Sequence, residues 1–69
     1  MTKTIRTTTE AGETMVWYLS KNGAVVVDLR KNFDGWGAYF RGKRMEGFSN
    51  KAQAVSHAKK WLKEAMKAE

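Results

Sequence analysis

The chain has 69 residues, no cysteine and a formal net charge of +6, which leaves room for one domain with a thin core. Without cysteine, neither a disulfide nor a zinc–thiolate site can reinforce the fold, and no apolar run approaches the roughly 20 residues needed to cross a bilayer. We therefore expect a cytoplasmic protein, and neither a membrane protein nor a disulfide-rich secreted one.

The first 13 residues are predicted to form an N-terminal arm or an edge strand. Residues 1–9 are rich in β-branched threonine but hold almost no side chain large enough for a core, and residues 10–13 have the composition of a turn. The remainder, 14–69, is expected to be a single domain of three strands followed by a helix. An unpaired threonine-rich edge can pair with a second copy of itself, so a homodimer is compatible with this organisation.

Residues 14–20 and 24–30 are predicted to form a β-hairpin. Both segments are rich in β-branched and aromatic side chains. The Asn22-Gly23 pair between them tolerates the positive φ of a tight turn, which is the strongest local signal in the chain. The three valines at 25–27 predict that the second strand is central, with both of its faces at least partly covered.

Side chains alternate between the two faces of a strand, so the first strand has two different sides. One side carries Met15, Trp17 and Leu19. The other side carries Val16 and Tyr18.

A third strand is expected over residues 36–41, after a turn at 32–35. One side of this strand would carry Trp36, Ala38 and Phe40, and the other would carry Gly37, Tyr39 and Arg41. A further turn is expected at 42–44, and residues 45–48 are expected to extend the sheet only briefly.

A helix is predicted from about residue 50 to residue 68, where glycine and proline are absent and strong helix formers dominate. Asn50 with Gln53 would form a capping box, and Ser49 with Phe48 packed outside it is an equally good start. An apolar stripe at helical spacing predicts the core face, made of Ala54, Val55, Ala58, Trp61, Leu62, Ala65 and Met66. The lysines on the opposite side, Lys59, Lys60, Lys63 and Lys67, have the pattern of a solvated face.

These elements predict an α+β fold, in which an antiparallel sheet of three strands, or four with the N-terminal strand, packs against one C-terminal helix. The helix is long enough to cross one face of the sheet. Nothing in the sequence is left to cover the other face. An uncovered face with aromatic rings and arginines is typical of a recognition surface.

The sequence holds no recognisable catalytic or metal-binding set. His57 is the single histidine, cysteine is absent, and the carboxylates show no ligand spacing. Gly35 and Gly37 lack the strand-to-helix context of a phosphate-binding loop. We expect no catalysis, no metal and no cofactor, so the protein should act by binding.

Basic residues interleaved with aromatic rings are the remaining candidates for a site. Residues 41–69 carry eight basic against three acidic residues, a net of +5, whereas residues 1–40 carry five against four, a net of +1. A basic field favours an anionic partner, arginine can bond phosphate or guanine, and rings can stack on bases. The candidate binding residues are Arg30, Tyr39, Arg41, Lys43, Arg44, Tyr18 and Trp36.

Three short motifs add a resemblance: WGAYF at 36–40, GKR at 42–44 and GFS at 47–49, followed by a helix with Ala54 and Ala58. Over residues 36–62 the chain resembles the plant ethylene-response-factor DNA-binding domain and the related arm-binding domain of phage integrases. The resemblance implies a three-stranded sheet on one helix that reads the DNA major groove with its exposed face. It also implies that the strands facing DNA carry Tyr39, Arg41, Lys43, Arg44 and Arg30. The chain lacks the arginine-rich stretch before the central tryptophan and has a shorter last hairpin.

Two functions are open on these observations. The first is a small non-enzymatic nucleic-acid-binding protein, with DNA as the expected partner, that uses the exposed sheet face and the basic hairpin at 41–44. The alternative is a small modulator of the phage type, which inhibits a host protein by docking an aromatic and basic face on an acidic partner. Neither function requires a membrane.

Overall fold

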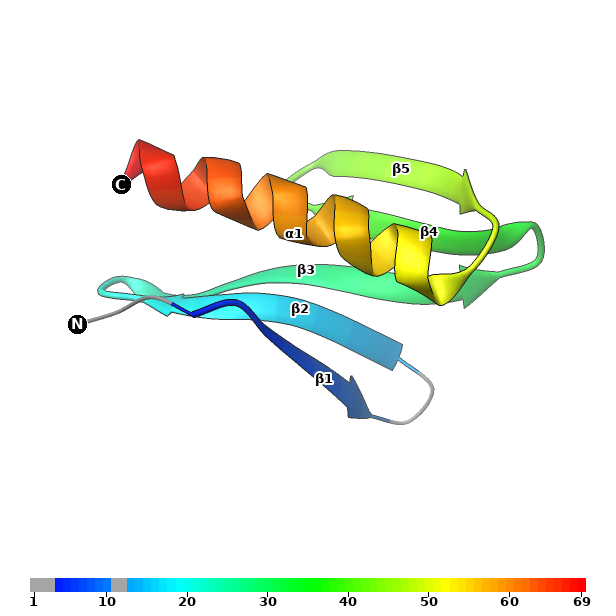
Figure 1. The fold of residues 1–69 in the computed structure, drawn as a ribbon, viewed down its shortest axis with the longest axis horizontal. Coiled ribbons are helices and arrows are strands. Elements are labelled where there is room, and N and C mark those ends of the chain that lie inside the picture. The colour runs from blue at the N-terminus through cyan, green and yellow to red at the C-terminus, as the bar shows by residue number, and fades with distance from the viewer. Residues whose placement is uncertain (1–3, 11–12) are drawn as a thin grey trace.

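The computed structural model describes residues 4–10 and 13–69 and contains five strands followed by one helix. The elements are β1 (Arg6–Glu10), β2 (Glu13–Ser20), β3 (Gly23–Asn32), β4 (Gly35–Phe40), β5 (Lys43–Phe48) and α1 (Lys51–Ala68). All five strands form one antiparallel sheet in chain order (Figure 1). The expected α+β class, antiparallel sheet and C-terminal helix are confirmed, but the expected three or four strands are corrected to five.

The two outer strands account for this correction. β1 pairs with β2 over five consecutive residue pairs, from Arg6 with Trp17 to Glu10 with Glu13. β5 is a full strand of six residues that begins at Lys43, inside the segment expected to be a turn. An edge strand needs only one hydrogen-bonded neighbour and little burial, so its sequence carries a weak signal. The rest of the expected arm and turn, residues 1–3 and 11–12, lies outside the described residues.

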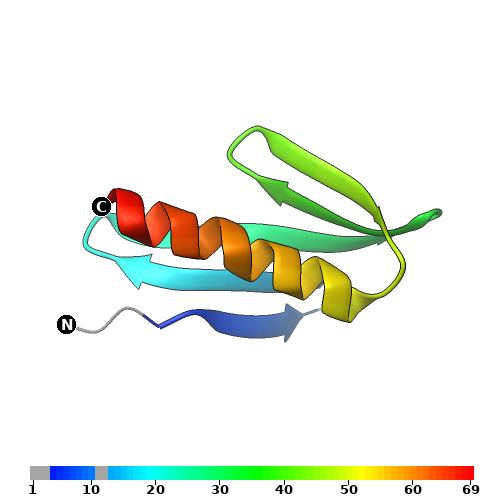
Figure 2. The same cartoon turned by 45° about the horizontal axis from the view of Figure 1, so that its top comes forward.

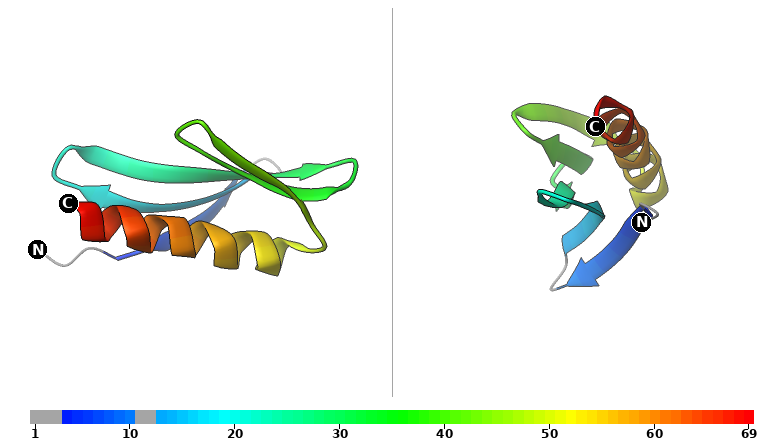
Figure 3. Two further views of the ribbon diagram at one scale, coloured as in Figure 1. Left: turned by 90° about the horizontal axis from the view of Figure 1, so that it is seen from above. Right: turned by 90° about the vertical axis from the view of Figure 1, so that its left-hand side faces the viewer.

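The protein has two layers. α1 lies across the sheet and contacts β2, β3, β4 and β5 (Figure 2). The sheet curves around the helix, so the side that faces the helix is concave and the opposite side is convex (Figure 3). No element of the described part of the chain covers the convex side.

The core lies between α1 and the concave side of the sheet. Its buried residues are Val16, Tyr18, Val25, Val27, Leu29, Ala38, Phe40, Ala54, Ala58 and Leu62. The strand residues in this set occur at every second position, and the helix residues at every fourth, as the two periodicities require. The predicted alternation along β2 and the predicted apolar stripe on the helix are therefore confirmed.

The start of α1 is the capping box centred on Asn50. The backbone N–H of Gln53 donates to Asn50 Oδ1 at 3.0 Å, and the N–H of Ser49 donates to Gln53 Oε1 at 3.0 Å. Two amide donors at the helix entrance are thus satisfied. Of the two starts that the sequence allowed, the structure has Asn50 as the N-cap.

Gly35, the first residue of β4, is required for two separate reasons. Its φ is +127°, and a Cβ built on it would overlap the carbonyl oxygen of Phe48. Gly23 is the matched control, because its φ is +116° but nothing lies near its missing Cβ. We expect Gly23→Ala to lower the free energy of unfolding by about 1–3 kcal/mol, and Gly35→Ala by at least about 1 kcal/mol more. Urea denaturation measures both, and equal losses would contradict the steric part of this explanation.

Candidate functional site

The convex side of the sheet, which we call the open face, is the candidate site. Directly opposite residues in an antiparallel pair share a face, so the strand register assigns each side chain to one side. Among the side chains that the structure describes, the aromatic and charged ones that this register places on the open face are Arg6, Trp17, Asp28, Arg30, Tyr39, Arg44 and Glu46.

The first arginine–aromatic pair joins β1 to β2. Arg6 lies opposite Trp17 in the register, and its guanidinium carbon is 5.6 Å from the centre of the indole ring. This separation lies within the cation–π range of about 6 Å. Trp17 is half-buried, whereas its neighbours Val16 and Tyr18 are buried beneath the helix. The indole is therefore presented on the open face with a guanidinium held against it.

A second pair joins β3 to β4. The guanidinium carbon of Arg30 lies 5.9 Å from the centre of the Tyr39 ring. The Asn32 side-chain amide donates to the Tyr39 hydroxyl at 3.0 Å, which holds the ring in place. Gly37 makes this close arrangement possible, because a Cβ there would lie 2.8 Å from the Asn32 amide nitrogen and 3.0 Å from the Tyr39 oxygen.

Arg44 extends this second pair onto β5. It lies opposite Tyr39 in the register, and its Nε is 3.1 Å from Glu46 Oε1. The two side chains are 70% and 46% exposed, and an ion pair in water contributes little free energy. Arg44 can therefore exchange Glu46 for an external phosphate or carboxylate at small cost.

Charge alone does not select the open face. Among the side chains that the structure describes, this face carries three arginines against Asp28 and Glu46. α1 holds five lysines and one glutamate, all exposed, so the helix side is the more basic one. The open face is distinguished by the combination of arginines with aromatic rings.

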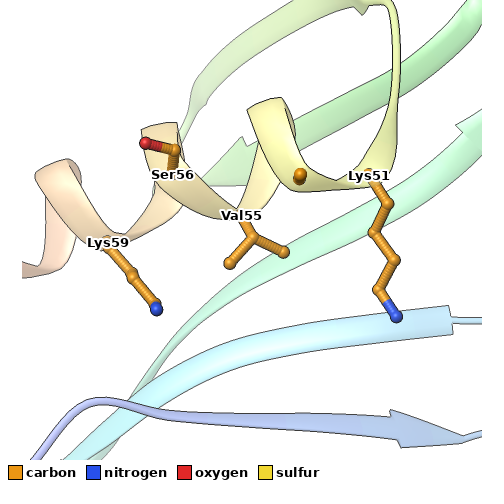
Figure 4. A pocket seen from close by; sticks show the side chains of 5 residues that line it. Lys51, Val55, Ser56 and Lys59 are labelled. Atoms are coloured by element: carbon orange, nitrogen blue, oxygen red, sulfur yellow. The ribbon is translucent and has the colours of Figure 1, made fainter.

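The helix side offers a shallow groove along α1, lined by Lys51, Ala52, Val55, Ser56 and Lys59. Figure 4 shows that Lys51, Val55 and Lys59 extend from one flank of the helix, whereas Ser56 points the other way. The lining holds neither an arginine nor an aromatic ring. Such a surface attracts anions through charge but has few groups that could orient them.

The structure divides the predicted binding residues between the two sides of the sheet. Arg30, Tyr39 and Arg44 lie together on the open face. The other four, which lie on the helix side, are Arg41, Lys43, Tyr18 and Trp36.

The basic hairpin is split because its turn separates neighbouring residues. Arg41 occupies the turn with a φ of +44°, and its guanidinium lies 5.3 Å from the centre of the Phe40 ring. Lys43 lies opposite Phe40 in the register and so shares its side. Both basic residues line a shallow depression beside Trp61 on α1. The hairpin therefore presents only Arg44 to the open face.

Tyr18 and Trp36 belong to the packing of the fold. Tyr18 is 1% exposed, and its hydroxyl donates to Glu69 Oε2 at 2.7 Å. Trp36 is half-buried, lies opposite Phe48 and packs against the core. Neither ring reaches the open face.

Burial raises the pKa of Tyr18 from its ordinary value of 10.0, and the hydrogen bond to Glu69 and its charge raise the pKa further, while Arg41 opposes them. The stability that this shift contributes is fully present below about pH 10, the pKa of an unfolded-chain tyrosine, and is lost as pH rises through the folded pKa. We expect the free energy of unfolding to fall above about pH 10. Tyr18→Phe should remove part of this fall in urea denaturation at stepped pH, and an unchanged profile would contradict the assignment.

Among the arginines and aromatic residues of the open face, Trp17 and Arg6 were absent from the predicted binding residues. A signal for Trp17 was present, because pairing the strands on either side of Asn22-Gly23 places Trp17 on the side where β3 carries Asp28. No comparable signal was present for Arg6, since its strand was not assigned a register.

His57 has an aromatic environment. Its ring lies 5.4 Å from that of Phe48 and 4.6 Å from that of Trp61, measured between ring centres. Within residues 4–10 and 13–69, no three His, Cys, Asp or Glu side chains form a group that could hold a metal ion. The same part of the chain contains no helix with the length and apolar content needed to cross a bilayer.

Comparisons of the chain with protein-family models, with curated protein sequences and with solved structures find no match. The resemblance of residues 36–62 to the ethylene-response-factor domain therefore stays a prediction.

Proposed function

We propose that the protein binds double-stranded DNA through the open face, without enzymatic activity. The shape of the sheet supports this proposal, because the open face is convex and the major groove is a concave channel about 12 Å wide. Three strands at a spacing of about 4.8 Å span about 10 Å. The central strands β2, β3 and β4 therefore fit the groove, and β1 and β5 would lie near the phosphate backbones on its two sides.

The observation that carries the proposal is the presence of two arginine–aromatic pairs on one uncovered face. Arginine bonds guanine or phosphate through two parallel hydrogen bonds, and Arg6 and Arg30 are held in place by Trp17 and Tyr39. A guanidinium that is already positioned loses less conformational freedom on binding. Arg44 is exposed on the β5 edge and would contact a phosphate.

The test compares two double variants, each of which loses two positive charges. The substituted residues are close together in the chain but lie on opposite sides of the sheet. Arg30→Ala/Arg44→Ala removes two arginines of the open face, and Arg41→Ala/Lys43→Ala removes the same charge from the helix side. Fluorescence anisotropy with a labelled duplex at low salt should show a loss of about tenfold or more for the first variant and about threefold or less for the second. Equal losses would indicate diffuse charge attraction, and no binding to a duplex would reject the proposal.

A protein partner is the second candidate, and one corner of the open face favours it. Leu19 is 59% exposed and lies on the same side as Trp17 and Val26, near the β2–β3 turn and away from Arg30 at the other end of β3. A host protein with an apolar site and an acidic rim would fit this corner and Arg6. In a pull-down from cell extract, a partner that survives nuclease treatment and is lost with Leu19→Asp would favour this function over DNA binding.

A further inference from the structure

We propose that two copies of this chain associate through β1 into a two-fold symmetric dimer. Its two sheets would join edge to edge into one antiparallel sheet. The contact runs along the edge of β1 and shares Arg6 with the proposed DNA contact, but it requires no DNA. It rests on the free edge of β1 and on the self-complementary order of its residues, Arg-Thr-Thr-Thr-Glu.

β1 is the more regular of the two sheet edges. Among the described elements it pairs only with β2, through five consecutive pairs without a register shift, and α1 contacts the other four strands. The opposite edge is irregular, because Gly47 on β5 has a φ of +88° and the β4–β5 register shifts between Trp36 and Ala38. Irregularities of this kind hinder edge-to-edge pairing, whereas a straight strand of threonines favours it.

Symmetry restricts the register of such a pair. Residues that lie opposite one another must point to the same face, so the two-fold axis has to pass through Thr7, Thr8 or Thr9. Only the axis at Thr8 pairs all five residues of the strand. That register places Arg6 of each copy opposite Glu10 of the other, while parallel pairing would place like charges together. Charge complementarity therefore selects a second copy in the antiparallel orientation.

The dimer would join the open faces of its two copies. A two-fold axis perpendicular to the sheet keeps both helices on the same side, so the two open faces become continuous. The Arg6–Trp17 pairs of both copies then flank the axis. A five-residue ladder with small side chains buries far less than the roughly 1,600 Å² of a standard interface, so we expect a weak dimer.

Sedimentation equilibrium of the full chain without ligand, from about 10 µM to about 1 mM, tests the proposal. The parent should dimerise within this range. Arg6→Glu and Glu10→Arg should each raise the dimer Kd by about tenfold or more, because both copies lose the attraction. The double variant Arg6→Glu/Glu10→Arg should return to within about threefold of the parent, since the charges match again. A monomer at every concentration, or a double variant as weak as the single ones, would overturn the proposal.

Three controls keep the result specific. Lys43→Glu makes the same charge reversal on the β5 edge and should leave the dimer unchanged; a loss with Lys43→Glu but not with Arg6→Glu would overturn the choice of edge. Thr8→Lys serves as a second test if the charge reversals affect folding, because Thr8 is exposed. It places two lysines together at the axis and should abolish the dimer. Amide exchange in β1 should slow as the concentration of the parent rises, and unchanged exchange would contradict the edge contact.

Discussion

Leu62→Ala is expected to lower the free energy of unfolding by about 3–5 kcal/mol, the largest loss for a single truncation on the helix. Leu62 is fully buried between α1 and the concave side of the sheet. A chain of 69 residues has a total stability of roughly 4–10 kcal/mol, so this variant should lose about a third or more of it. Urea denaturation followed by circular dichroism measures the change.

Trp61→Ala is the matched control on the next residue of the same helix. Trp61 is half-buried, stacks on Phe40 with ring centres 6.1 Å apart and touches His57 at its edge. Its removal should cost about 1–3 kcal/mol, less than the removal of Leu62, because part of the indole is already in water. A larger loss for Trp61 than for Leu62 would mean that the helix is rotated relative to the sheet.

Removing Arg6, Arg30 and Arg44 together is expected to change the salt dependence of duplex binding the most. Each phosphate contact releases condensed counterions, so log affinity falls with log salt at a slope of about 0.9 per contact. Three lost contacts would flatten the slope by up to about 2.7. Anisotropy titrations at four or five salt concentrations measure the slope, and circular dichroism verifies that the variant is folded.

The control is a helix variant in which Lys59, Lys60 and Lys63 are replaced by alanine, which removes the same number of positive charges. These lysines are exposed on α1, and α1 lies on the side of the sheet opposite to the open face, so they cannot contact a duplex bound there. Their removal should change the slope by less than about one contact. A larger change for the lysine variant than for the arginine variant would move the binding surface to the helix.

The helix and the central hairpin were largely predictable because their signals are local. Asn50 and Gln53 are three residues apart and cap the helix through contacts within one turn. The hairpin between β2 and β3 was expected at Asn22-Gly23, and the structure pairs Ser20 with Gly23, which alone in this turn has a positive φ. The two turn residues are therefore Lys21 and Asn22, one position earlier than the expected Asn22-Gly23. Glycine follows them because that position has a positive φ.

The outer strands were harder to predict because their stability is not local. β1 and β5 contain few large apolar side chains, and only pairing with β2 and β4 stabilises them as strands. The side to which each basic residue points depends on the same pairing. Arg41 and Arg44 are three residues apart in one hairpin, yet the turn sends the first to the helix side and the second to the open face.

The sequence by itself determined the elements whose information lies within a few residues: the alternation along β2, β3 and β4, the capped helix, its apolar stripe and the excess of basic charge toward the C-terminus. The tertiary structure decided which of two plausible faces became the site. Trp17 and Tyr18 are adjacent aromatic residues, and either could have been exposed until the helix covered one side of the sheet. Because α1 packs on the side of Tyr18, burial removed that ring from the surface and left Trp17, with Arg6 beside it, on the open face.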